Sequence, residues 1–257
     1  MAGGWGALSV ISVLLLLLAG ILAGMVNAVA GGGTFLVFGA LTLTGLPPIS
    51  ANATSSIVQF PGYITSTLAY WADIRRLWRV TLPLAVASVV GGLVGSLILL
   101  TLDNAAFRLL VPWLLVAATV LFAVGPWLRP RPRTDGGAAP HTLTGIVVQF
   151  LTSIYGGFFG AGMGVVMLAT LGLTQPGDYH RLNAMKNLLA AVIATTAIVV
   201  FVSGGVIGWL QTLIMAPGVA LGGYGGVWVA RHLPQLAIRI FVIAVGAGLA
   251  LYYFIGG

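Results

Sequence analysis

The chain has 257 residues, of which 59% are hydrophobic and only 6% are charged, with 11 basic and 4 acidic side chains. A soluble domain carries about a quarter charged residues, so this composition excludes a soluble globular enzyme. The formal net charge of +7 does not indicate nucleic-acid binding, because the basic residues fall in short segments between long uncharged ones, as the positive-inside rule predicts for a membrane protein.

The uncharged stretches predict about ten membrane segments. No charged residue precedes Asp73, and several later gaps between charges are as long as a membrane span of about 20 apolar residues. The N-terminal stretch lacks a basic leading region, so we interpret it as a first membrane helix rather than a cleaved signal peptide. The expected segments lie near residues 7–28, 33–45, 53–71, 80–101, 107–126, 142–160, 163–174, 184–203, 206–230 and 236–255.

Two basic segments set the predicted orientation. The loop expected at 73–79 contains three Arg, and the Pro- and Arg-rich run at 126–140 contains three more. The positive-inside rule places both segments in the cytoplasm, and the two membrane segments between them agree with that placement. The sequence therefore predicts a multi-pass protein of the plasma membrane with its N-terminus and C-terminus outside.

The two halves of the chain resemble each other. The Gly-rich run 30–34 matches 159–163, and the polar run 52–56 matches 183–187. Each half holds five expected segments, and an odd number forces the second copy to enter the membrane upside down. We therefore predict an all-α polytopic membrane protein of two inverted five-segment repeats, an arrangement that recurs in secondary transporters. The expected division is a first membrane repeat at 1–128, a cytoplasmic linker at 129–141 and a second, inverted repeat at 142–257.

The second segment of each half is short and follows a glycine cluster. Residues 34–44 and 163–174 cover only about half a bilayer at about 1.5 Å per residue. Short, broken helices in matching positions indicate a transport site, because a helix that begins after glycines directs its positive N-terminal end at the ligand. The alternative is that the glycines only allow close helix packing. We favour the site interpretation because both copies precede a short segment.

One pattern occurs twice, in residues 20–56 and in residues 155–187. It consists of a Gly-rich turn, a short helix, a Gly/Pro turn and the start of a further helix. In this pattern the sequence resembles the TauE/SafE family of exporters of sulfite and organosulfur anions, and the resemblance covers nearly the whole chain. It implies a plasma-membrane exporter of sulfite, sulfonates or similar small anions. The second glycine run departs from the usual Gly-x-Gly-Gly-Gly form at Ala161 and Met163.

Lys186 is the sharpest candidate for contacting an anion, because a lone cation at membrane depth costs about 3 kcal/mol and normally has a functional partner. The alternative is that its side chain snorkels to the cytoplasmic surface near Arg181. Asn52 and Thr54 have an alternative role as helix N-caps, which is compatible with ligand binding. The predicted substrate-binding residues are Gly31, Gly32, Gly33, Thr34, Asn52, Thr54, Ser55, Ser56, Gly160, Gly162, Asn183, Lys186 and Asn187.

Other polar residues give weaker or negative signals. Gln59 and Gln149 stand inside apolar segments, where we expect them to hydrogen-bond to neighbouring helices. The chain has no cysteine, and its three histidines fall in expected loops far apart in sequence. Neither a metal-ligand spacing nor a nucleophile motif is recognisable, so we expect no metal, no cofactor and no enzymatic activity.

The sequence therefore favours a transporter that moves a small anion, with export as the expected direction. An anion channel would share the same lining and stays open as an alternative. An intramembrane enzyme would need a deep acid, base or nucleophile, and an accessory protein would need a soluble domain or charged tail to bind a partner. The expected partners are a small anionic substrate and the lipid bilayer, without nucleic acid, and a homo-oligomer is left open.

Overall fold

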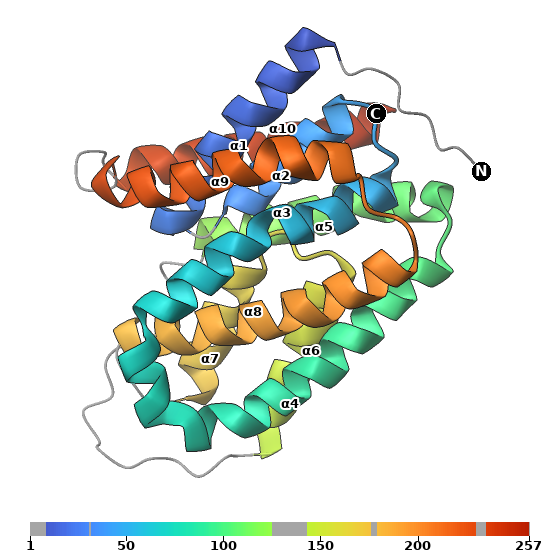
Figure 1. Cartoon of the computed structure of the whole chain (residues 1–257). Coiled ribbons are helices and arrows are strands. Elements are labelled where there is room, and N and C mark those ends of the chain that lie inside the picture. The colour runs from blue at the N-terminus through green and yellow to red at the C-terminus, as the bar shows by residue number, and fades with distance from the viewer. Residues whose placement is uncertain (1–8, 31, 125–142, 176–178, 230–234, 257) are drawn as a thin grey trace.

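The computed structural model of the chain describes residues 9–30, 32–124, 143–175, 179–229 and 235–256. These residues form ten α-helices and no β-strand, so the prediction of an all-α protein is confirmed for this part of the chain (Figure 1). The linker expected at 129–141 lies outside the described residues. The helices are α1 (Val10–Ala30), α2 (Gly33–Leu43), α3 (Pro48–Ala69), α4 (Trp71–Thr101), α5 (Asn104–Val124), α6 (Leu143–Phe158), α7 (Met163–Thr174), α8 (Tyr179–Ser203), α9 (Trp209–Val229) and α10 (Gln235–Ile255).

Four helices in the described part are long and apolar enough to cross a membrane, namely α1, α4, α5 and α8. The helices α2, α6 and α7 and residues Ile240–Ile255 of α10 are apolar but shorter. The two short segments predicted after the glycine clusters are thus observed as α2 with 11 residues and α7 with 12.

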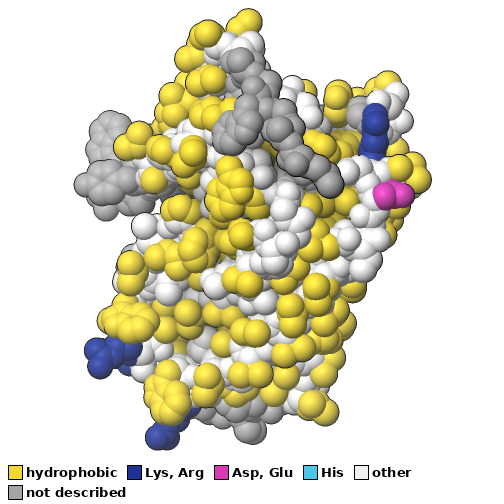
Figure 2. All heavy atoms as spheres, turned by 45° about the vertical axis from the view of Figure 1, so that its right-hand side comes forward, with side chains coloured by type: hydrophobic (Ala, Val, Ile, Leu, Met, Phe, Trp, Pro, Cys, Tyr) yellow, Lys and Arg dark blue, Asp and Glu magenta, His cyan; other side chains and the backbone are white. Residues whose placement is uncertain are grey.

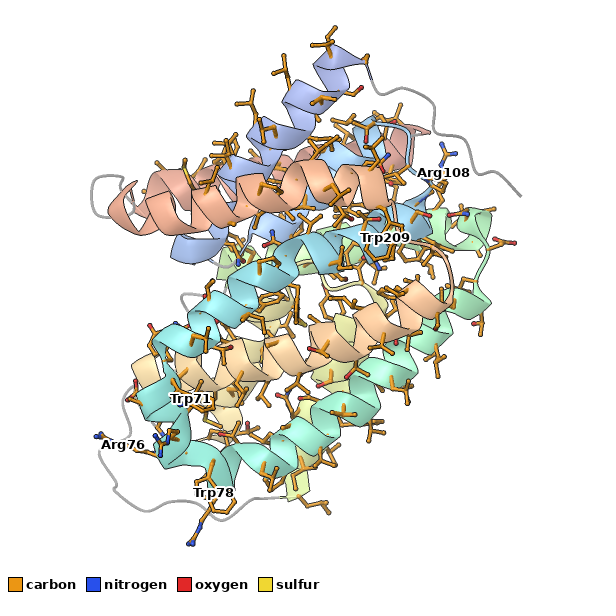
Figure 3. All side chains as sticks on the ribbon, viewed as in Figure 1. Trp71, Arg76, Trp78, Arg108 and Trp209 are labelled. Atoms are coloured by element: carbon orange, nitrogen blue, oxygen red, sulfur yellow. The ribbon has the colours of Figure 1, made fainter. Side chains whose placement is uncertain are left out.

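Charged side chains gather at the two ends of the molecule, and apolar side chains cover the surface between them (Figure 2). Trp71, Arg76 and Trp78 lie at one end, whereas Arg108 and Trp209 lie at the other (Figure 3). Many large apolar side chains on the intervening surface are more than half exposed, among them Leu18, Val86 and Leu213. An apolar band between two polar ends is the surface that a bilayer requires.

Three helices begin five or more residues earlier than the hydrophobic pattern predicts, namely α3, α4 and α8, the last at Tyr179 rather than 184. The start of α3 is at Pro48 rather than 53, because proline is favoured in the first turn, where its missing N–H leaves no bond unmade. The start of α4 is at Trp71 rather than 80, so the Arg-rich run expected as a loop at 73–79 is helical. With 31 residues α4 is about 46 Å long, which exceeds the hydrocarbon core of about 30 Å and leaves its first turns outside the core.

Glycines in the left-handed region end two of the helices. Gly45 has a φ of 84° after α2, and Gly205 has a φ of 66° after α8. At the first, the Leu46 N–H donates to the Leu41 carbonyl oxygen at 3.3 Å and the Gly45 N–H donates to Thr42 at 2.9 Å. This pair of bonds is a Schellman motif, which satisfies the last carbonyl groups of the helix.

Two pairs of helices, α1 with α9 and α4 with α6, cross at glycines. A Cβ at Gly95 of α4 would lie 2.8 Å from the backbone nitrogen of Phe158 in α6 and closer still to the Ile154 carbonyl oxygen. A Cβ at Gly24 of α1 would lie 2.7 Å from the backbone nitrogen of Gly223 in α9. Glycine therefore lets these backbones approach closely, as small residues do between membrane helices.

Replacing Gly95 with alanine is expected to lower the free energy of unfolding by about 1–3 kcal/mol, because the added methyl group forces α4 and α6 apart. Gly248 of α10 is the matched control, since a Cβ there would meet no neighbouring atom of the described residues within 4 Å. Thermal unfolding of the two alanine variants in detergent measures the difference. Equal melting temperatures would show that the α4–α6 crossing tolerates a side chain at this point.

The remaining contacts place the two short helices in the interior. Helix α3 packs against α8, and α5 packs against α10. The short helix α2 contacts α1, α3 and α10, while α7 contacts α5, α6 and α8. The first residues of α2 and α7 are buried as a result, including Thr34 and Gly164.

Candidate functional site

The two Gly-rich turns meet in the interior. The Gly162 N–H in the second turn donates to the Thr34 hydroxyl oxygen at the start of α2, at 3.3 Å. Phe38 of α2 contacts Phe159 of the second turn edge to face, with ring centroids 5.7 Å apart. Both short helices therefore begin at one place, although they are separated by more than a hundred residues in the sequence.

The second turn depends on glycine conformation. Gly160 has a φ of 70° and Gly162 a φ of 72°, which an L side chain rarely adopts. Gly162 is the N-cap residue of α7, and its conformation lets the chain reverse and enter the helix at once. Ala161 and Met163, where the run departs from an unbroken glycine cluster, do not have a positive φ.

Both short helices begin with unoccupied backbone donors. No side chain caps α2 or α7. Among the described residues, no group accepts a hydrogen bond from the backbone N–H of Thr34 or of Gly164. Free N–H groups and the positive ends of two helix dipoles make this place favourable for an anion.

A small cavity lies where the two helices begin. Its volume is about 10 Å³, which is room for about one water molecule. The cavity residues come from α2, α3, α6, α7, α8 and the turn before α7, and they are Thr34, Ser55, Ser56, Tyr63, Gly156, Gly160, Met163, Ala194 and Ala197.

The hydroxyl groups in the cavity can donate to an anion. Thr34 accepts from Gly162, so its own O–H stays available. Ser55 and Ser56 donate to the Asn52 carbonyl oxygen in their own helix, at 2.7 and 3.4 Å, and can rotate toward a ligand. In the described part of the chain no acidic side chain lies at the cavity to repel an anion, because Asp73 and Asp103 are both exposed near helix ends.

The glycines of the first turn have a different environment from those of the second. Gly31 lies outside the described residues. A Cβ at Gly32 would lie 2.7 Å from Val242 Cγ1, and one at Gly33 would lie 2.9 Å from Asn27 Cβ. Both positions thus need glycine because α2 begins close to its neighbours, and neither residue lines the cavity.

Asn52 and Thr54 hold α3 to the second half of the chain. The Asn52 amide donates to the Phe158 carbonyl oxygen at 2.9 Å, and the Thr54 hydroxyl accepts from the Gly208 N–H at 2.9 Å. The alternative role as N-caps is excluded, because α3 begins four residues before Asn52, at Pro48. Their side chains are almost fully buried and engaged, and they lie outside the cavity lining.

Asn183, Lys186 and Asn187 lie together near the start of α8, away from the cavity lining. The Asn183 amide donates to the Tyr70 hydroxyl at 3.3 Å, at the end of α3. Lys186 is partly buried, and no hydrogen bond or ion pair reaches its ammonium group from the described residues. It precedes the cavity residue Ala194 by eight residues, or about 12 Å along the helix.

The two buried glutamines behave differently. Gln149 donates to Ser88 of α4 at 2.9 Å and to Ser153 at 3.1 Å, so its predicted bond to a neighbouring helix is confirmed. The same prediction for Gln59 is wrong, because neither polar atom of its side chain has a hydrogen-bond partner within the described residues.

Sequence reasoning does not select five of the cavity residues. Tyr63 follows Ser56 by two helical turns, so helical spacing could have found it. The other four have no polar side chain, so their residue types alone do not indicate a binding site. These residues are Gly156, Met163, Ala194 and Ala197.

A helical membrane protein with two broken helices that meet at an interior cavity has the architecture of a transporter. The family model described as "Sulfite exporter TauE/SafE" matches residues 16–253. The chain therefore belongs to the TauE/SafE family and is a membrane transporter, which confirms the resemblance seen in the sequence.

Named relatives extend over most of the chain. It is 27% identical over 232 residues to "Probable membrane transporter protein" of Haemophilus influenzae, which covers 87% of each chain. It is 28% identical over 232 residues to "Probable membrane transporter protein YfcA" of Escherichia coli (strain K12), covering 88% of this chain and 83% of that one. With "Probable membrane transporter protein YunE" of Bacillus subtilis the identity is 23%, over 93% of this chain and 97% of the relative.

Proposed function

We propose that the protein exports a small sulfur oxyanion, sulfite or an organosulfonate, across the plasma membrane. The observation that carries the proposal is the convergence of two uncapped helix N-termini on a cavity lined by hydroxyl groups. The N–H and O–H donors suit sulfite or sulfonate oxygens, and the helix dipoles balance negative charge. The family description, which names sulfite, favours this substrate over other small anions.

We infer that the two halves, 1–128 and 142–257, are inverted repeats joined by a cytoplasmic linker at 129–141, with both chain termini outside. The order of helices supports this, because each half has five and the second of each is short. The packing supports it too, since α1 packs against α9 as its counterpart α6 packs against α4. The site then lies where the two copies meet, as in other inverted-repeat transporters.

The route to the cavity runs along α3 and α8 in this proposal. Ala197 and Ala194 line the cavity, and Asn187, Lys186 and Asn183 follow on the same helix toward its start. Tyr63 lines the cavity from α3, which packs against α8, and Tyr70, the residue directly after α3, accepts a hydrogen bond from Asn183. Lys186 would draw the anion from the Arg-rich end of the molecule toward the helix N-termini.

A carrier fits the dimensions of the cavity better than a channel. The cavity has room for about one water molecule, and a sulfur oxyanion is larger, so helices or side chains must move before the substrate enters. A site that opens by movement is expected of alternating access, in which one repeat moves against the other.

Flux in proteoliposomes tests the proposal. Purified protein should accelerate the movement of sulfite, thiosulfate, sulfoacetate or taurine, and the rate should saturate with concentration. Liposomes without protein are the negative control. Liposomes with the Gly248→Ala variant are the positive control. Acceleration of none of these compounds would refute the substrate class, and a rate that never saturates would favour a channel.

A further inference from the structure

Gln59 is buried in an unusual way for an amide. Its side chain is 0% exposed, and both its Nε2 and its Oε1 lack a hydrogen-bond partner among the residues that the structure describes. No other described residue has two side-chain polar atoms in this condition. A buried amide that makes no bond destabilises the folded state, so a leucine or methionine would serve the fold better at this position.

The location of Gln59 connects it with the cavity. It lies one helical turn after Ser55 and one turn before Tyr63 on α3, and both of these residues line the cavity. Residues four apart lie on the same face of a helix, so Gln59 stands between two cavity residues on that face.

The carboxamide of Asn27 on α1 lies near that of Gln59 on α3. A Cβ added at Gly62 would be 3.6 Å from Asn27 Nδ2 and 4.0 Å from Gln59 Oε1, so the two amides lie on either side of this glycine. Glycine at residue 62 places no side-chain atom of its own between them.

We propose that Gln59, with Asn27 beside it, binds oxygen atoms of the substrate when the cavity opens. The inference rests on the proposed function and names a further contact for the same sulfur oxyanion. The carboxamide donates N–H groups without adding charge, so it can orient the anion without holding it too tightly for release. In the closed site the amide is unpaired, which destabilises the folded state but keeps the donor available for the substrate.

Gln149 provides a matched control. It is also a buried glutamine, 2% exposed, but its Nε2 donates to Ser88 and Ser153. Its role is to join α4 and α6. Neither glutamine is a lining residue of the cavity, but Gln59 stands between two lining residues of its own helix, Ser55 and Tyr63. Methionine has nearly the same length as glutamine and removes the amide in both cases.

The experiment compares Gln59→Met and Gln149→Met by two measurements, thermal unfolding of the purified protein and sulfite flux in proteoliposomes. Gln59→Met should keep or raise the melting temperature by about 2–4 °C, because an unpaired amide is removed, yet lower the flux at least tenfold. Gln149→Met should lower the melting temperature and keep the flux per folded molecule.

Two results would overturn the inference alone while the wild type transports sulfite. One is normal flux through Gln59→Met, and the other is a fall in its melting temperature like that of Gln149→Met, which would make the residue structural. If the wild-type protein transports no sulfur oxyanion, the proposed function fails and this contact fails with it. The wild-type flux thus separates the two failures.

Discussion

Replacing Lys186 with alanine is expected to lower anion flux at least tenfold and to leave the protein folded in the membrane. A lysine at membrane depth costs about 3 kcal/mol, so its removal does not weaken the fold. Its ammonium group lies partly buried on α8 without a hydrogen bond or ion pair to a described residue, which leaves its charge available to an anion. The measurement is sulfite flux in proteoliposomes, normalised to inserted protein.

Two further variants sharpen this prediction. Lys186→Arg should retain part of the flux, because it keeps the charge but replaces a compact ammonium with a planar fork. Arg76→Ala is the matched control, since Arg76 is an exposed cation on α4 at one end of the molecule (Figure 3). Normal flux through Lys186→Ala would mean that the side chain only reaches the membrane surface, and the site would then rest on backbone and hydroxyl donors.

Anion movement is expected to be electrogenic and to need no coupled proton. The four acidic residues stand at positions 73, 103, 135 and 178, outside the apolar segments, so the sequence offers no carboxylate for a proton relay in the membrane. An inside-negative potential drives a monoanion outward by about 2.3 kcal/mol per 100 mV, and a tenfold gradient corresponds to about 1.4 kcal/mol. The potential alone can therefore hold a monoanion tens of times more dilute inside than outside.

Clamping the potential with potassium and valinomycin at equal pH on both sides measures this dependence. The flux should reverse when the sign of the potential reverses. A flux that ignores the clamped potential but follows an imposed pH gradient would contradict the expectation and would require a proton path.

Several features of the fold could be predicted because they depend on local chemistry. The long gaps between charged residues predicted the apolar helices, and the glycine clusters predicted the short helices α2 and α7. The starts of α3 and α4 could not be found from apolar runs, because helix formation extends through polar residues. Asn52 lies within α3, and the Arg-rich run at 73–79 forms the first turns of α4.

The candidate site was harder to predict, because the type of a residue does not determine the direction in which its side chain points. Ser55, Ser56, Thr34 and Gly160 do line the cavity. Asn52 has the same polar character but points to the backbone of another helix. Whether a buried glutamine finds a hydrogen-bond partner depends on which residues surround it in three dimensions, and no pattern in the sequence distinguishes Gln59 from Gln149.

The central claim is that the N-termini of α2 and α7 hold the anion between them. Selenite has the charge and shape of sulfite, and its selenium atom can be located by anomalous scattering in a crystal of the protein. We expect a selenium peak in the cavity beside Thr34, Ser56 and Gly160, lost or weakened when excess sulfite competes. Selenium found only near surface arginines, or absent from the cavity at saturating selenite, would contradict the account.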